Sequence, residues 1–203
     1  MSSKPRLWTK GFILDTLVNF LIYIIYYMLM VIIASEAIHS LNASMSEAGL
    51  ASGIFILGTL VARLFAGRSV ELYGRKKMLF AGIIFYLATT FMYFGIHSMA
   101  MLFLVRCLNG IGYGIASTAT STIVSTMIPA ERRGEGINYY ALSMSLAAAI
   151  GPFIGMLMQQ IFPFEDIIYF CIAMIVVCLG AASVMHVEEM ELTEEHRVAL
   201  KEI

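Results

Sequence analysis

The stretch LFLVRCLNGIGYG, residues 102–114, places a single arginine, Arg106, inside a long apolar segment. Three glycines follow it at intervals of two residues: Gly110, Gly112 and Gly114. A charged side chain is costly within lipid and is found there facing protein or a water-filled cavity. We therefore expect Arg106 to point inward from a membrane-spanning helix.

The composition supports a membrane protein. Of the 203 residues, 60% are hydrophobic and 13% are charged, and the mean hydropathy is +0.83. Soluble domains carry about 25% charged residues, so a soluble globular domain is a poor fit. The three cysteines Cys107, Cys171 and Cys178 lie in apolar runs without metal-ligand spacing, which predicts neither a disulfide nor a metal site.

Six apolar segments are long enough to cross a bilayer, which takes about 20 helical residues. They occupy residues 12–34, 48–66, 78–96, 99–122, 136–161 and 166–186. The first follows basic residues, as a secretory signal does, but it is too long for a signal and five further spans follow it. We predict an all-α membrane protein with a six-helix transmembrane bundle over residues 1–186 and the start of a cytoplasmic linker over 187–203.

In the segments outside the spans, lysine and arginine occur on only one side of the membrane. They precede the first span, follow the sixth, and lie in the second and fourth connections, whereas residues 35–47, 97–98 and 162–165 contain none. The positive-inside rule then places both termini in the cytoplasm of a multi-pass protein of the cell membrane. The second set of three spans begins on the opposite side from the first, which predicts two inverted three-helix repeats, as in many secondary transporters.

The second connection, GRSVELYGRKKML at residues 67–79, contains a spaced pattern of glycine, acidic and basic residues. This pattern resembles the signature loop between spans two and three of the major facilitator superfamily, in which Asp and Arg are usual where this chain has Glu71 and Leu72. The resemblance implies a loop that takes part in gating. Its residues are Gly67, Glu71, Gly74, Arg75 and Lys76.

The span 99–122 carries a second pattern, in which Arg106 is followed by Asn109, Gly110 and Gly112. It resembles the span-four motif of the same superfamily, with Asn109 where glutamine is more usual. The resemblance implies that Arg106 and Asn109 belong to the transport pathway. A purely structural arginine bonded to neighbouring carbonyl groups is the alternative.

Two further stretches favour the exporters of that superfamily. PAERRGEG at 129–136 resembles their short basic loop, and Gly151, Pro152 and Gly155 match the Gly-Pro-x-x-Gly core of a motif associated with proton-driven antiporters. Met156 replaces the usual second glycine. From the residues alone, a proline kink and close helix packing are expected here.

The span 12–34 holds Asp15 and Asn19, which are four residues apart and share a helix face. In antiporters of this family an acidic group in the first span often exchanges the proton, so the resemblance implies proton coupling by Asp15 together with Asn19. An interfacial aspartate that helps to start the helix is the alternative. Tyr23, Tyr26 and Tyr27 continue or flank this face, either lining a cavity or packing between helices.

The resemblance implies half of a twelve-helix transporter that exports small molecules by proton antiport with alternating access. The expected partners are a small-molecule substrate, protons, the lipid bilayer, and either a missing C-terminal six-helix half or a parallel second copy. We expect the face toward that half to include Gly67, Gly151, Pro152, Gly155 and Arg106.

Other functions are considered as alternatives. The alternatives to an exporter are a non-transporting truncated membrane protein or partner subunit, and an uptake symporter of the same superfamily. Catalytic patterns such as HExxH and GxSxG do not occur, and GIGYGIA at 110–116 lies within a span with no strand before it, so no enzyme is predicted. No cofactor, metal or nucleic acid is expected.

Overall fold

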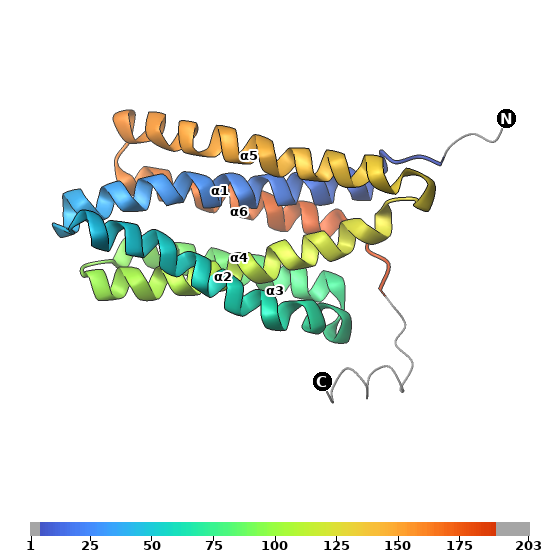
Figure 1. Ribbon diagram of the computed structural model, residues 1–203, viewed down its shortest axis with the longest axis horizontal. Coiled ribbons are helices and arrows are strands. Elements are labelled where there is room, and N and C mark those ends of the chain that lie inside the picture. The colour runs from blue at the N-terminus through green and yellow to red at the C-terminus, as the bar shows by residue number, and fades with distance from the viewer. Residues whose placement is uncertain (1–4, 190–203) are drawn as a thin grey trace.

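The computed structural model describes residues 5–189 and is a bundle of six long helices (Figure 1). Each is long and apolar enough to cross a membrane, and the described part of the chain contains no strand. This confirms the predicted all-α fold with six spans. The helices are α1 (Lys10–Leu41), α2 (Met45–Tyr73), α3 (Arg75–Phe91), α4 (Met99–Met127), α5 (Arg133–Ile161) and α6 (Phe164–Val184), with short 3₁₀ turns η1 (Met92–Gly95) and η2 (Ala130–Arg132).

The two sets of three helices run from opposite ends of the bundle. The start of α1, the α2–α3 and α4–α5 turns and the end of α6 lie at one end, on the right in Figure 1, and the other three connections lie at the left. We call the first end the basic end, because Arg75, Lys76 and Arg132 lie there. This is the topology expected of inverted repeats. Of the predicted linker at 187–203, residues 190–203 lie outside the described residues.

The helix ends follow local sequence signals. The Thr9 hydroxyl accepts a hydrogen bond from the backbone N–H of Phe12 at 3.2 Å and caps α1. Ser44 and Glu47 form a reciprocal capping box at the start of α2. Gly74 joins α2 to α3 with φ of 101°, a conformation that glycine adopts without a steric penalty. The tight turn expected in the loop 67–79 is therefore made by Gly74.

Helix α4 packs closely on both α2 and α3, and its spaced glycines explain how. A side chain at Gly110 would overlap the backbone carbonyl of Phe55 in α2, and a Cβ at Gly112 would lie 2.7 Å from the backbone nitrogen of Tyr86 in α3. Residues two apart lie on different faces of a helix. Gly110 therefore allows α2 to approach α4 closely, and Gly112 allows the close approach of α3.

Replacing Gly110 by alanine is expected to lower stability by about 1–3 kcal/mol, because the added methyl group must displace backbone rather than a flexible side chain. Gly180→Ala is the matched control, since nothing lies within 4 Å of that Cβ position in α6. Thermal unfolding of the two variants in detergent measures the difference. Equal stability of the two variants would contradict the close contact between α2 and α4.

One side of the bundle carries a groove. Helices α2 and α5 flank it, while α1 and α4 form its floor and pack against each other. Ile56 of α2 is exposed and lines the groove on one side, and Met144 of α5 lines it on the other. This side is suited to contact lipid or a second transmembrane unit.

Candidate functional site

Arg106 is fully buried, about two helical turns after the start of α4 at Met99. Its Nε donates to the carbonyl oxygen of Ala51 in α2 at 3.2 Å, and its Nη1 donates to the hydroxyl of Tyr93 in η1 at 3.1 Å. The guanidinium carbon lies 4.4 Å from the centre of the Phe55 ring. Only Nη2 lacks a hydrogen-bond partner among residues 5–189. The arginine thus holds α2 and η1 against α4.

Asn109 extends this cluster toward α3. Its side-chain NH₂ donates to the hydroxyls of Thr89 and Thr90 at 3.0 and 3.1 Å, and its Oδ1 accepts from the Tyr93 hydroxyl at 3.3 Å. Tyr93 therefore links Asn109 to Arg106. The contacts of Arg106 are those of the structural alternative, because a backbone carbonyl, a phenol and a ring surround it.

A second polar cluster joins α1, α4 and α5. The Asn19 side chain donates to the Ser143 hydroxyl at 3.4 Å and accepts from the Thr120 hydroxyl at 3.3 Å, and the Tyr140 hydroxyl donates to Thr120 at 3.0 Å. All four side chains are buried. This cluster links α1 of the first three-helix repeat to α4 and α5 of the second repeat at the floor of the groove.

Asp15 lies one helical turn from Asn19, toward the basic end. Its side chain is fully buried, and neither carboxylate oxygen has a hydrogen-bond partner among the described residues. The alternative of an interfacial aspartate that starts the helix does not account for this burial, because Thr9 caps α1 instead.

The three tyrosines of α1 divide between the two expected roles. Tyr23 and Tyr26 line the groove with Phe55 and Tyr113, and the ring of Tyr26 is stacked on that of Phe55 with centroids 5.0 Å apart. Tyr27 instead packs toward α5, where a Cβ at Gly151 would lie 2.7 Å from its Cβ. Cavity lining therefore describes two of them and helix packing the third.

The antiporter-type motif in α5 faces α1. Gly151 and Gly155 are buried, and a Cβ at Gly155 would lie 3.1 Å from Met28, while Pro152 is half-buried within a continuous helix. The expected close packing is thus present. The expectation that Gly151, Gly155 and Arg106 face a second half is wrong, since neighbouring helices of this chain cover all three.

The loop 67–79 contacts the segment that follows α6. The Glu189 carboxylate accepts from the backbone N–H groups of Arg75 and Lys76 at 2.7 and 3.0 Å, and the Lys76 ammonium donates to the carbonyl of Met185 at 2.7 Å. Glu71 is exposed, and open space surrounds the Cβ position of Gly67. The basic residues of the loop therefore hold the end of α6 to the start of α3.

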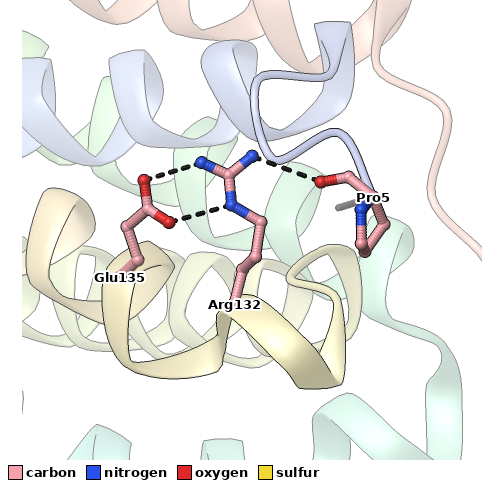
Figure 2. Close-up of polar contacts among 3 residues, drawn as sticks. All are labelled: Pro5, Arg132 and Glu135. Atoms are coloured by element: carbon pink, nitrogen blue, oxygen red, sulfur yellow. Dashed lines mark hydrogen bonds and ion pairs between the residues drawn. The ribbon is translucent and has the colours of Figure 1, made fainter. Parts of the chain in front are cut away.

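The short basic loop before α5 binds the N-terminal segment. Figure 2 shows the Arg132 guanidinium paired with both carboxylate oxygens of Glu135, at 2.6 and 2.8 Å, and donating to the carbonyl of Pro5 at 3.2 Å. These bonds connect η2, α5 and the chain before α1 at the basic end.

Sequence reasoning missed Arg63, which lies on α2 beside the groove. Its guanidinium is exposed and donates to the Ser117 hydroxyl at 3.4 Å. Its signal was available, because Arg63 is a lone charge within the predicted span 48–66, as Arg106 is within the span 99–122.

Six apolar helices, inverted repeats and polar groups enclosed between them define a multi-pass membrane protein of the secondary-transporter type. The sequence profile of the Major Facilitator Superfamily matches residues 16–198. The chain belongs to the major facilitator superfamily, a family of transporters and not of enzymes.

Named relatives support the efflux branch of this family. The chain is 29% identical over 65% of its length to an uncharacterized MFS-type transporter of Methanocaldococcus jannaschii, covering 34% of that protein. It is 26% identical over 68% of its length to multidrug resistance protein MdtL of Citrobacter koseri, and the match covers 36% of that protein. With multidrug resistance protein 1 of Bacillus subtilis, it is 24% identical over 83% of its length, covering 43%. The matched stretches thus span less than half of each relative.

Proposed function

We propose that the protein containing this chain exports small molecules across the cell membrane by proton antiport with alternating access. The observation that carries the proposal is Asp15, a fully buried carboxyl group without a hydrogen-bond partner among the described residues, inside a membrane-spanning helix. The relatives named as multidrug resistance proteins support the direction of transport.

The environment of Asp15 suits a proton carrier. An ionised carboxylate enclosed without a cation or a donor is strongly disfavoured, whereas the neutral acid is tolerated. Release of the proton therefore requires an opening that admits water or a substrate to Asp15. Such an opening would couple the protonation of Asp15 to the conformation of α1, α4 and α5.

The groove is the proposed half-site for substrate. Tyr23, Tyr26 and Tyr113 supply an aromatic wall, and between Ile56 of α2 and Met144 of α5 the groove is proposed to face a second transmembrane unit. That unit is either a C-terminal six-helix half or a parallel second copy of the chain. In this arrangement the basic end is cytoplasmic, as the distribution of Lys and Arg predicts.

The loop 67–79 and the enclosed cluster of Arg106 and Asn109 are proposed to support this cycle without touching substrate. Arg75 and Lys76 bind the end of α6, so movement of α3 at the basic end requires these bonds to rearrange. Gly151, Pro152 and Gly155 keep α5 close to α1, the helix that carries Asp15.

Everted membrane vesicles containing the whole protein test the proposal. An imposed pH gradient, acidic inside, is expected to drive accumulation of a transported compound, and a protonophore is expected to abolish it. Vesicles without the protein are the control. Accumulation that persists unchanged with the protonophore would contradict proton antiport.

A further inference from the structure

Arg63 presents a positive charge to the groove from within the membrane. It lies 10 residues before the end of α2 at Tyr73, or about 15 Å from the basic end of the helix. Its side chain is exposed, and across residues 5–189 it forms no ion pair. Its one described hydrogen bond, to Ser117, is long at 3.4 Å. Arg63 therefore differs from Arg106, which is enclosed by protein.

Two hollows of the groove meet at Arg63 and Tyr23. The first is aromatic and includes Tyr26, Phe55 and Tyr113. The second is lined along α4 by hydroxyl groups, including those of Ser117, Ser121 and Ser125. Arg63 thus stands between a surface suited to an apolar body and a surface suited to polar groups.

The hydroxyl groups do not provide the charge recognition. Ser117, Ser121 and Ser125 each donate to a backbone carbonyl of α4, at 3.3, 2.9 and 2.7 Å. These bonds use the hydroxyl hydrogens, so the serine oxygens have only lone pairs left to accept hydrogen bonds from a molecule in the groove. The guanidinium of Arg63 is consequently the charged donor of this surface.

We infer that Arg63 binds the carboxylate of a small organic anion whose apolar body lies against Tyr26, Phe55 and Tyr113. A guanidinium matches a carboxylate with two parallel hydrogen bonds. The inference rests on the proposed transport function, because it names the substrate class for that groove.

Three compounds with one apolar body provide the test: 2-naphthoate, neutral 2-naphthamide and cationic 2-naphthylmethylammonium. Equilibrium binding to the purified whole protein is measured for each. The naphthoate is expected to bind roughly 10- to 100-fold more tightly than the other two, as charge-assisted hydrogen bonds allow. Arg63→Gln is expected to remove this preference while leaving naphthamide binding unchanged, and Arg63→Lys is expected to retain part of it.

Lys77→Gln is the matched control, because it removes a basic residue at the exposed start of α3 outside the groove. It is expected to retain the full preference for naphthoate. Naphthamide binding by Arg63→Gln reports that the groove is intact. Binding of none of the three compounds, stronger binding of the cation, or a preference for naphthoate that survives Arg63→Gln would each overturn the inference. The last result would assign the preference to a group other than Arg63.

Transport of the same compounds separates this inference from the proposed function. Anion binding that depends on Arg63, without accumulation in a pH gradient, would support the subsite and contradict proton antiport. Gradient-driven accumulation of the ammonium compound alone, in excess of the passive accumulation by vesicles without the protein, would support antiport and contradict the anion subsite.

Discussion

Asp15→Asn is expected to abolish uphill transport driven by a pH gradient while preserving substrate binding. The amide has nearly the same shape as the acid but does not exchange a proton in the relevant pH range. Asp15 is fully buried without a hydrogen-bond partner in the described part of the chain, so the substitution breaks no described side-chain bond. Accumulation in everted vesicles and binding to the purified protein are the two measurements.

Glu36→Gln is the matched control for Asp15→Asn. Glu36 lies on the same helix near the opposite end of the bundle, where its side chain accepts a hydrogen bond from Ser40. Transport by this variant is expected to remain coupled. If Asp15→Asn accumulates substrate as the unmodified protein does, Asp15 is a structural residue and another group carries the proton.

Arg106→Lys is expected to reduce efflux about tenfold or more, with membrane insertion intact. A lysine ammonium retains the charge but lacks the planar guanidinium that reaches Ala51, Tyr93 and the Phe55 ring together. Loss of a hydrogen bond to a charged group costs about 1.5–3 kcal/mol. Because Phe55 also lines the groove, we propose that Arg106 positions the surface that binds substrate.

Efflux and substrate affinity are measured for Arg106→Lys beside the amount of inserted protein. Arg133→Lys is the control, since it changes an exposed arginine at the start of α5, at the basic end, while retaining charge. If Arg106 positions the groove, Arg106→Lys binds substrate more weakly while the amount of inserted protein is unchanged. A folding defect would instead lower the amount of inserted protein. Normal proton-driven efflux by Arg106→Ala would remove Arg106 from the account.

The sequence predicts the bundle well because membrane spans are set by apolar length and by the distribution of basic residues. The predicted span 12–34 lies within α1, which continues to Leu41. Its extra length was missed because hydropathy detects the apolar centre of a helix, whereas Thr9 and Asn42 define its ends. The span 78–96 likewise includes the 3₁₀ turn η1 after Phe91.

The sites were harder to predict because helical periodicity shows which residues share a face but not which helix covers it. Arg106 was expected to point inward, and it does, yet its partners come from α2 and η1, far away in the sequence. Gly151 and Gly155 were assigned to the wrong face for the same reason, since the contact with α1 is a tertiary one. The grouping of Arg63 with Tyr23 arises only when α1, α2 and α4 are assembled.

A measurement of proton release on substrate binding tests directly whether Asp15 carries the coupled proton. The purified whole protein in weakly buffered detergent solution is mixed with a transported compound, and the pH change is followed with an indicator dye. We expect release of a proton by the unmodified protein and by Glu36→Gln, and none by Asp15→Asn at saturating compound. Equal proton release by Asp15→Asn would contradict the assignment of the coupled proton to Asp15.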